Sequence, residues 1–414
     1  MRRSARTRDV VFLVHHDDMS AGHVPKGAGM EDEVFELPER VVAIERRLKG
    51  LRHTTDPEHK SLPGEAMMSV IGGDVGFGSV ALEKDADAGA TQQRGKKRAR
   101  RRATCNGYVR RDAASTAARG SLWSCCIPVF APLAAESDLL LVHSRSHLKK
   151  LRKFCTCAES LNAAFFPFYR GTTLVRTPSG QHDAPKTRKD ADEDFFFSPG
   201  TMRAMQRAAG GAVEAVERLF ATLDRKKSKR TSPPPSSFAI VRPPGHHCCG
   251  KTAAGFCLLN NTATAAAHAR HVLGLERVAI VDWDYHHGDG TQSIFYDDPS
   301  VLTISMHVGM EFADRREEDK EGPDDADRYL EITYPGKPGM LFTGQHGRRK
   351  GKGYNINIPW PNRMVGRDEY LEAMRTIVCP ALLGFEPQLI ICASGFDAVK
   401  DDILAGTNLL PGVY

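Results

Sequence analysis

The sequence predicts an α/β fold in which helices cover both faces of a mainly parallel sheet. Short apolar runs rich in β-branched residues, at 238–241, 278–281 and 389–393, have the composition of strands buried on both faces. Segments with helical spacing of apolar residues, such as 199–223 and 368–383, lie between or before these runs. This alternation of strand and helix indicates a three-layer α/β/α arrangement, and the length allows one large α/β domain or two or three domains.

Composition bounds the class of protein. The chain has 414 residues, of which 41% are hydrophobic and 26% charged, enough for a substantial core. No apolar run approaches the roughly 18 residues of a transmembrane helix, so we expect no membrane span. The possible core of a signal peptide near the N-terminus, Val10 to Val14, is too short, so we do not expect secretion. The ten cysteines then indicate mostly reduced thiols, and their pairs lack the repeated spacing of a structural zinc site.

The pattern along the chain predicts three regions. Residues 1–52 form the N-terminal part of the domain, and 137–414 its main part. Between them, in 53–136, periodicity fails and small polar residues dominate, so we expect a low-complexity, basic insertion that is disordered. Smaller insertions are expected near 177–193, 225–236 and 311–327.

A basic run within the long insertion, residues 94–102, reads R-G-K-K-R-A-R-R-R. Such a run is typical of a nuclear localisation signal or a nucleic-acid patch, and equally of a solvated tract with no receptor. We favour the nuclear signal, with the cytoplasm as a second location, and expect no sequence-specific binding of nucleic acid.

One stretch concentrates ionisable residues where a strand ends. The apolar run 278–281 is followed by Asp282, Asp284, His286 and Asp289. In an extended segment side chains alternate, so Asp282, Asp284 and His286 would face one point. Carboxylates gathered at the end of a buried strand repel one another unless a cation or protonated histidines balance them. A metal site is therefore a more economical interpretation than a charged surface loop.

Two other strand ends carry residues suited to the same chemistry. His246 and His247 follow a strand and two prolines, and Asp397 follows the strand 389–393. The carboxyl ends of parallel strands meet at one edge of a sheet. Asp284, His286 and Asp397 would give a metal ion one imidazole and two carboxylates, with open positions for water and substrate. This ligand set suits Zn²⁺ and Fe²⁺.

The tandem histidines complete a hydrolytic site. His246 and His247 would act as acid and base partners, and Asp282 and Asp289 could orient their imidazoles. Together these residues describe metal-assisted hydrolysis of an amide.

Four motifs in order carry a resemblance to a known family: R-P-P-G-H-H, G-F-C-L-L-N-N, V-D-W-D-Y-H-H-G-D-G-T-Q and S-G-F-D-A. They resemble the zinc-dependent histone deacetylases, class II above all, and the bacterial acetylpolyamine amidohydrolases. The resemblance covers 137–414 well, apart from the insertions, and 9–51 weakly. It implies the arginase/deacetylase fold and removal of acetyl groups from lysine side chains of histones or other proteins. Hydrolysis of small acetylated amines needs the same metal core and is the alternative.

The resemblance also implies roles for individual residues. Asp284, His286 and Asp397 match the zinc ligands, and the pair His246 and His247 is backed by Asp282 and Asp289. The resemblance further implies that Phe256 and Tyr334 are the walls of an acetyl-lysine tunnel. It also implies that Asp194 is a rim residue that holds the substrate backbone, and that Asp282 and Ser305 help to bind a structural K⁺ near the zinc.

One departure from the family pattern adds an alternative of another class. In the family a Glu-Gly-Gly-Tyr segment downstream of S-G-F-D-A supplies a hydroxyl that stabilises the oxyanion. The sequence ends at Tyr414, so we expect a C-terminally truncated domain. Losing one oxyanion donor typically costs about 10²- to 10³-fold in rate. A catalytically impaired scaffold or fragment therefore stands beside the enzyme, which the resemblance links to chromatin regulation, transcription repression and corepressor-type partners.

Overall fold

The computed structural model describes residues 11–16, 19, 67–72, 126–162, 196–224, 236–314, 328–336, 338–402 and 405–413. Eight strands in this described part form one sheet in the order β3-β1-β4-β2-β10-β5-β6-β9, and every neighbouring pair is parallel. The strands are β1 Val11–His15, β2 Met67–Gly72, β3 Cys126–Phe130, β4 Ser236–Ile240, β5 Val278–Asp282, β6 Val301–Val308, β9 Asn355–Trp360 and β10 Leu389–Ser394.

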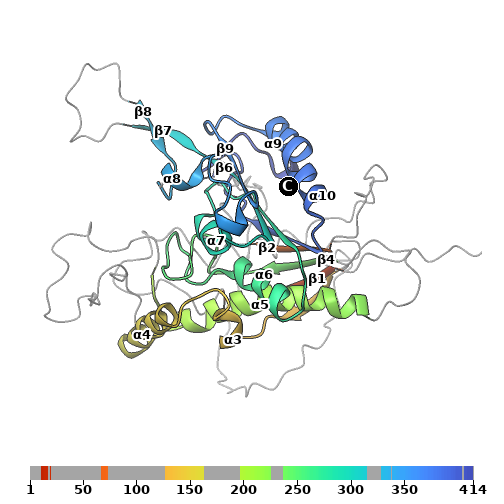
Figure 1. Ribbon diagram of the computed structural model, residues 1–414. Helices are drawn as coiled ribbons and strands as arrows, with labels where there is room; N and C mark the ends of the chain where they lie inside the picture. Colours follow the sequence, from red (N-terminus) through yellow and green to blue (C-terminus); the bar gives the residue numbers. More distant parts are fainter. Residues whose placement is uncertain are drawn as a thin grey trace, which may run out of the picture.

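Helices lie on both sides of this sheet (Figure 1). They are α3 Glu136–Leu139, α4 Arg145–Leu161, α5 Thr201–Asp224, α6 Asn261–His271, α7 Asp289–Phe295, α8 Pro338–Leu341, α9 Arg367–Ala373 and α10 Cys379–Phe385. A π-helical turn, Met374–Val378, joins α9 to α10. None of the helices in the described part of the chain combines the length and the apolarity that crossing a bilayer requires.

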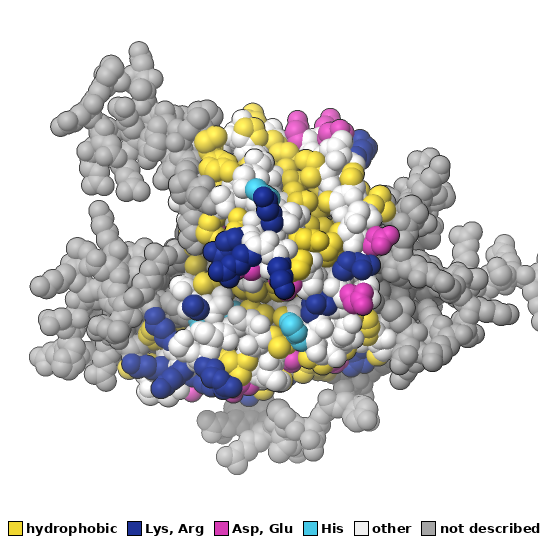
Figure 2. All heavy atoms as spheres, in the orientation of Figure 1, with side chains coloured by type: hydrophobic (Ala, Val, Ile, Leu, Met, Phe, Trp, Pro, Cys, Tyr) yellow, Lys and Arg dark blue, Asp and Glu magenta, His cyan; other side chains and the backbone are white. Residues whose placement is uncertain are grey.

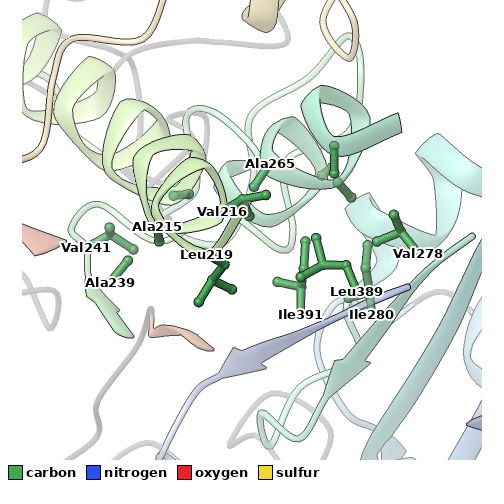
Figure 3. Close-up of a cluster of buried hydrophobic side chains, with 14 of the residues drawn as sticks. Ala215, Val216, Leu219, Ala239, Val241, Ala265, Val278, Ile280, Leu389 and Ile391 are labelled. Atoms are coloured by element: carbon green, nitrogen blue, oxygen red, sulfur yellow. The ribbon is translucent and has the colours of Figure 1, made fainter. Parts of the chain in front are cut away.

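Strand β5 shows that both faces of the sheet are buried. Val278 and Ile280 pack in one apolar cluster with α5 and α6, which cover that face of β4, β5 and β10 (Figure 3). Ala279 and Val281 belong to the cluster of the opposite face, together with Tyr370 of α9. All five residues of β5 are buried. The predicted three-layer α/β/α architecture is therefore confirmed.

Small residues let α5 approach the rest of the core closely. Ala208, Ala212 and Ala215 are fully buried against the sheet and α6, and longer side chains such as Leu219 fill the remaining space. Full burial of one leucine-sized side chain contributes roughly 1.5–3 kcal/mol. Gly210 lies where a Cβ would overlap the carbonyl oxygen of Pro132, so no larger residue fits there without a shift.

The surface has two distinct regions on the face shown in Figure 2. Basic side chains gather where Figure 1 places α4, whose exposed residues include Arg145, Lys149 and Lys153. Apolar side chains are exposed around α9 and α10, where Met364, Ile377 and Leu383 reach solvent.

The structure corrects the boundaries of the expected insertion at 53–136, because two strands lie within it. β2 pairs with both β4 and β10 in the middle of the sheet, and β3 pairs with β1 at its edge. The sequence of β2, M-M-S-V-I-G, is a short run with four apolar residues and no helical period, a pattern that central parallel strands often have. The basic run 94–102 lies outside the described residues.

The expected insertion at 311–327 is also corrected at its start. Met310–Asp314 is strand β7, which pairs antiparallel with β8, Arg328–Ile332. The segments 177–193 and 225–235 lie outside the described residues, and Ser236 already belongs to β4.

Two glycine substitutions should have opposite effects on stability. In an exposed helix, Gly→Ala stabilises by roughly 0.5–1 kcal/mol, and we expect this for Gly384→Ala in α10, where an added Cβ meets nothing within 4 Å. Gly210→Ala should instead destabilise by about 1–3 kcal/mol, because the added Cβ meets rigid backbone at Pro132. Urea unfolding of the two variants beside the wild type measures both signs. An increase in stability for Gly210→Ala would contradict the packing described for α5.

Candidate active site

The candidate site lies at the carboxyl ends of the central strands. β5 ends at Asp282, β10 ends at Ser394, and β4 leads through Arg242 to the tandem histidines. Because β5 and β10 are hydrogen-bonded neighbours, the loops that follow them meet at one point. The adjacent strands therefore bring together segments that are far apart in the sequence.

Asp284, His286 and Asp397 converge there. Their ligand atoms lie within 4.8 Å of one another. Nδ1 of His286 lies 3.3 Å from Oδ1 of Asp284 and 2.9 Å from Oδ2 of Asp397. The backbone N–H of Tyr285 donates to the other carboxylate oxygen of Asp397 at 2.8 Å, which fixes the orientation of that side chain.

Asp282 takes a different place from the one expected from strand alternation. It does not join the three converging residues; its Oδ2 lies 3.0 Å from Nδ1 of His246, and its Oδ1 accepts from the Asp284 backbone N–H. The strand ends at Asp282, so the chain turns before Asp284 and the alternation of side chains stops.

The tandem histidines are buried and each ring contacts one carboxylate. His246 contacts Asp282, and Nδ1 of His247 lies 2.9 Å from Oδ1 of Asp289, the first residue of α7. The two rings are 4.0 Å apart between centroids, and Nε2 of His246 lies 3.7 Å from Asp284. A carboxylate at Nδ1 holds the ring hydrogen on that nitrogen and leaves the lone pair on Nε2.

Burial and charge set the protonation of these groups. The pKa of His247 is lowered to about 3, mainly by burial and also by the nearby His246, against the opposing effect of Asp289. Burial also raises the pKa of Asp284, and the charge of Asp397 adds to this. Burial alone would lower the pKa of His286, but its hydrogen bonds to Asp284 and Asp397 outweigh it and raise that pKa. Positive charge is thus favoured between the two carboxylates.

The donor set fits a divalent cation. One imidazole and two carboxylates, with atoms close enough to share one ion, are ligand types that both zinc and iron accept. For K⁺, Asp282 and Ser305 face each other as partners on neighbouring strands, but the Ser305 hydroxyl is already hydrogen-bonded to His307 at 2.8 Å.

Three glycines allow this crowding. A Cβ on Gly395 would overlap the carboxylate of Asp284, and one on Gly288 would lie 2.5 Å from Oδ2 of Asp282. Gly255, at φ +50°, lies against the ring of His247. A small cavity of about 20 Å³, lined in part by His246, Asp282 and Asp284, has room for about one water molecule.

The expected substrate-binding residues have different outcomes. Tyr334 lies edge-on to His247, with 5.0 Å between ring centroids, and 6.1 Å from the ring of His286. Phe256 is half-buried and adopts a left-handed backbone conformation, φ +64°, directly after Gly255. Asp194 lies outside the described residues.

Sequence reasoning missed groups that act through the backbone or through packing. The Tyr285 N–H that donates to Asp397 is a backbone group that any residue except proline would supply, so the residue type does not reveal it. Gly395 did leave a signal, because it stands between a strand and a candidate ligand, where a close approach of another side chain is the usual reason for glycine.

Gly395→Ala should weaken binding of a divalent ion. The added methyl group displaces the Asp284 carboxylate, and disturbed support of a ligand typically costs about 10- to 100-fold in affinity. Zinc titration with a competing chelator gives the affinity directly, with Gly384→Ala as the matched control because its Cβ meets nothing. Equal affinities in Gly395→Ala and wild type would contradict the assignment of Asp284 to the ion.

Comparison with known proteins adds to this geometry. The family profile described as "Histone deacetylase domain" matches residues 109–414. Polyamine deacetylase HDAC10 of Rattus norvegicus is 33% identical over 273 residues, which cover 65% of this chain and 37% of the relative. Histone deacetylase HDA1 of Candida albicans is 34% identical over 284 residues, 68% of this chain and 28% of the relative. The chain thus spans well under half the length of these two relatives.

Among solved structures, the crystal structure of the HDA15 HD domain aligns with a TM-score of 0.61 at 24% identity. The alignment covers 98% of this chain and 77% of the other. At this identity the likeness supports the fold alone.

Proposed function

The chain belongs to the histone deacetylase family, and from this premise we propose that it is a metal-dependent hydrolase that removes acetyl groups from lysine side chains of histones or other proteins. One observation carries the proposal: three residues that can share a cation lie beside two buried histidines, each held by its own carboxylate. This arrangement serves hydrolysis, because it combines an ion site with an acid/base pair in a site largely shielded from solvent.

The ion in this proposal is Zn²⁺, with Fe²⁺ as the second candidate, held by Asp284, His286 and Asp397. When bound, a divalent cation supplies Lewis acidity, which makes water more acidic and polarises a carbonyl oxygen. The protein supplies the remaining functions through its own side chains.

His247 is the proposed base. It is neutral near pH 7 because burial lowers its pKa, and Asp289 at Nδ1 leaves Nε2 free to accept a proton from water. The imidazolium that forms is stabilised by the same carboxylate, and it can then donate a proton to the amine that leaves. His246 is held in the same way by Asp282 and lies closest to the ion ligands.

Phe256 and Tyr334 are the proposed walls of the substrate channel. Tyr334 packs edge-on against His247. Gly255, which directly precedes Phe256, lies close to the rings of both His247 and Tyr334. An acetylated, uncharged side chain fits between aromatic walls, because it loses little hydration on entering.

A second candidate is hydrolysis of acetylated polyamines. It is favoured by the relative from Rattus norvegicus, whose printed name is a polyamine deacetylase. Both substrates present the same acetylated primary amine, so the ion site does not distinguish them.

The test measures acetate released by the purified chain from an acetyl-lysine peptide and from an acetylated polyamine, with bound metal counted in the same sample. We expect metal-dependent turnover with the peptide preferred, none in Asp284→Ala, and about 10²- to 10⁴-fold slower turnover in His247→Ala with metal content unchanged. Preference for the polyamine would support the second candidate. Stoichiometric metal without turnover on either substrate would contradict the proposal of an active enzyme and would favour the catalytically impaired scaffold.

We also propose, from the basic run 94–102, that the protein acts in the nucleus. The family resemblance suggests corepressor-type partners there. Deleting these nine residues should lower the nuclear fraction of a fluorescent fusion. A substitution of the same residues by neutral ones controls for the change in length. An unchanged nuclear fraction in both would refute the import signal.

A further inference from the structure

Three buried side chains outside the candidate active site also lie close enough to share an ion: His143, His147 and Cys248. We propose that they form a second, structural metal site for a soft or borderline cation such as Zn²⁺ or Cu⁺. One thiolate and two imidazoles are ligands that these cations prefer over oxygen-only sites.

The distance between two of the donors already suits an ion. Nε2 of His147 lies 3.6 Å from Sγ of Cys248. Tetrahedral zinc with bonds of about 2.3 Å to sulfur and about 2.0–2.1 Å to nitrogen separates two such ligands by about 3.6 Å. An ion therefore requires little movement of either side chain.

The third donor is His143, whose two ring nitrogens have different surroundings. Nε2 of His143 accepts a hydrogen bond from the Asn260 backbone N–H, so the ring hydrogen is on Nδ1. Nδ1 is fully buried, and its polar neighbour is the backbone of Cys249, at a geometry outside that of an ordinary hydrogen bond. The ring of His143 lies 5.0 Å from that of His147. Binding through Nδ1 would move the ring hydrogen to Nε2, where it would face the Asn260 N–H, so the His143 ring must turn away from Asn260 when an ion binds.

The backbone carbonyl of Leu258 lies next to the two groups that lose a hydrogen when an ion binds, His147 Nε2 and Cys248 Sγ. The oxygen of Leu258 lies 3.0 Å from Nε2 of His147 and 3.1 Å from Sγ of Cys248, so it accepts from both groups in the absence of an ion. Coordination releases the thiol proton to solvent and moves the ring hydrogen of His147 to its other nitrogen. The backbone of Lys251 also hydrogen-bonds this ring, which provides the orienting contact that metal-bound histidines usually have.

The position of the cluster indicates a structural role. Cys248 directly follows His247, whereas His147 lies in the first turn of α4 and His143 precedes that helix. The side chain of Asn260 binds both the carbonyl of Cys248 and the hydroxyl of Thr291 in α7. An ion at this cluster would therefore fix the loop that carries the tandem histidines against α4 and the start of α6.

Two measurements on the intact chain test the proposal. The first counts tightly bound metal: we expect two ions per chain in the wild type, and one in either Asp284→Ala or Cys248→Ala. The second replaces the metal by Co²⁺, which gives a near-ultraviolet charge-transfer band only when a thiolate is bound. The band should persist in Asp284→Ala, disappear in Cys248→Ala and remain in the matched control Cys249→Ala.

These outcomes separate the two sites. Absence of the thiolate band in cobalt-loaded wild type and in Asp284→Ala would overturn the second site, whatever the activity of the enzyme. Neither of these two proteins carries a change at the cluster, so the result stands even if Cys248→Ala fails to fold. Loss of the band in Cys249→Ala would equally overturn the assignment of Cys248.

Discussion

The repulsion between two buried carboxylates is the constraint on which this site depends. Asp284 and Asp397 follow neighbouring strands, and both are buried, so solvent screens their charges only weakly. His286 lies between them, and the Tyr285 N–H adds a donor to Asp397. Such a pair is stable only with positive charge at its centre. The same requirement explains why an ion is expected there. A separate, steric constraint applies to Gly395, which has to leave the space next to the Asp284 carboxylate unfilled.

The fold was predictable because buried parallel strands and amphipathic helices have distinct apolar patterns. β5 and α5 follow those patterns closely, and the polar residues that follow β4, β5 and β10 are where the chemistry was expected. β2 was not predictable, because a six-residue strand with four apolar side chains, M-M-S-V-I-G, shows no clear period within a low-complexity segment, and its partners β4 and β10 are remote in sequence. Strand alternation wrongly grouped Asp282 with Asp284 and His286, because the strand ends at Asp282; the family resemblance placed it behind His246, where the structure has it.

The cluster of His143, His147 and Cys248 shows a different limit of sequence reasoning. The two histidines are one helical turn apart, a spacing that many solvated helices contain, and the cysteine follows about a hundred residues later. Only packing of α4 against the loop after β4 makes them neighbours. The loop that carries His247 and Cys248 thus presents consecutive side chains to two different environments, the acid/base pair and the cluster beneath α4.

The place of β2 has a consequence for the order in which the molecule can fold. Its register pairs Met67 with Leu389, so the middle of the sheet joins segments from opposite parts of the chain. Closing so long a loop is entropically costly, and contacts of such high sequence separation form slowly. During synthesis, β4 and β2 can associate well before β10 exists, but the gap between β2 and β5 stays open until β10 is made. Asp397, carried on the loop after β10, is therefore the last of the three converging residues to arrive.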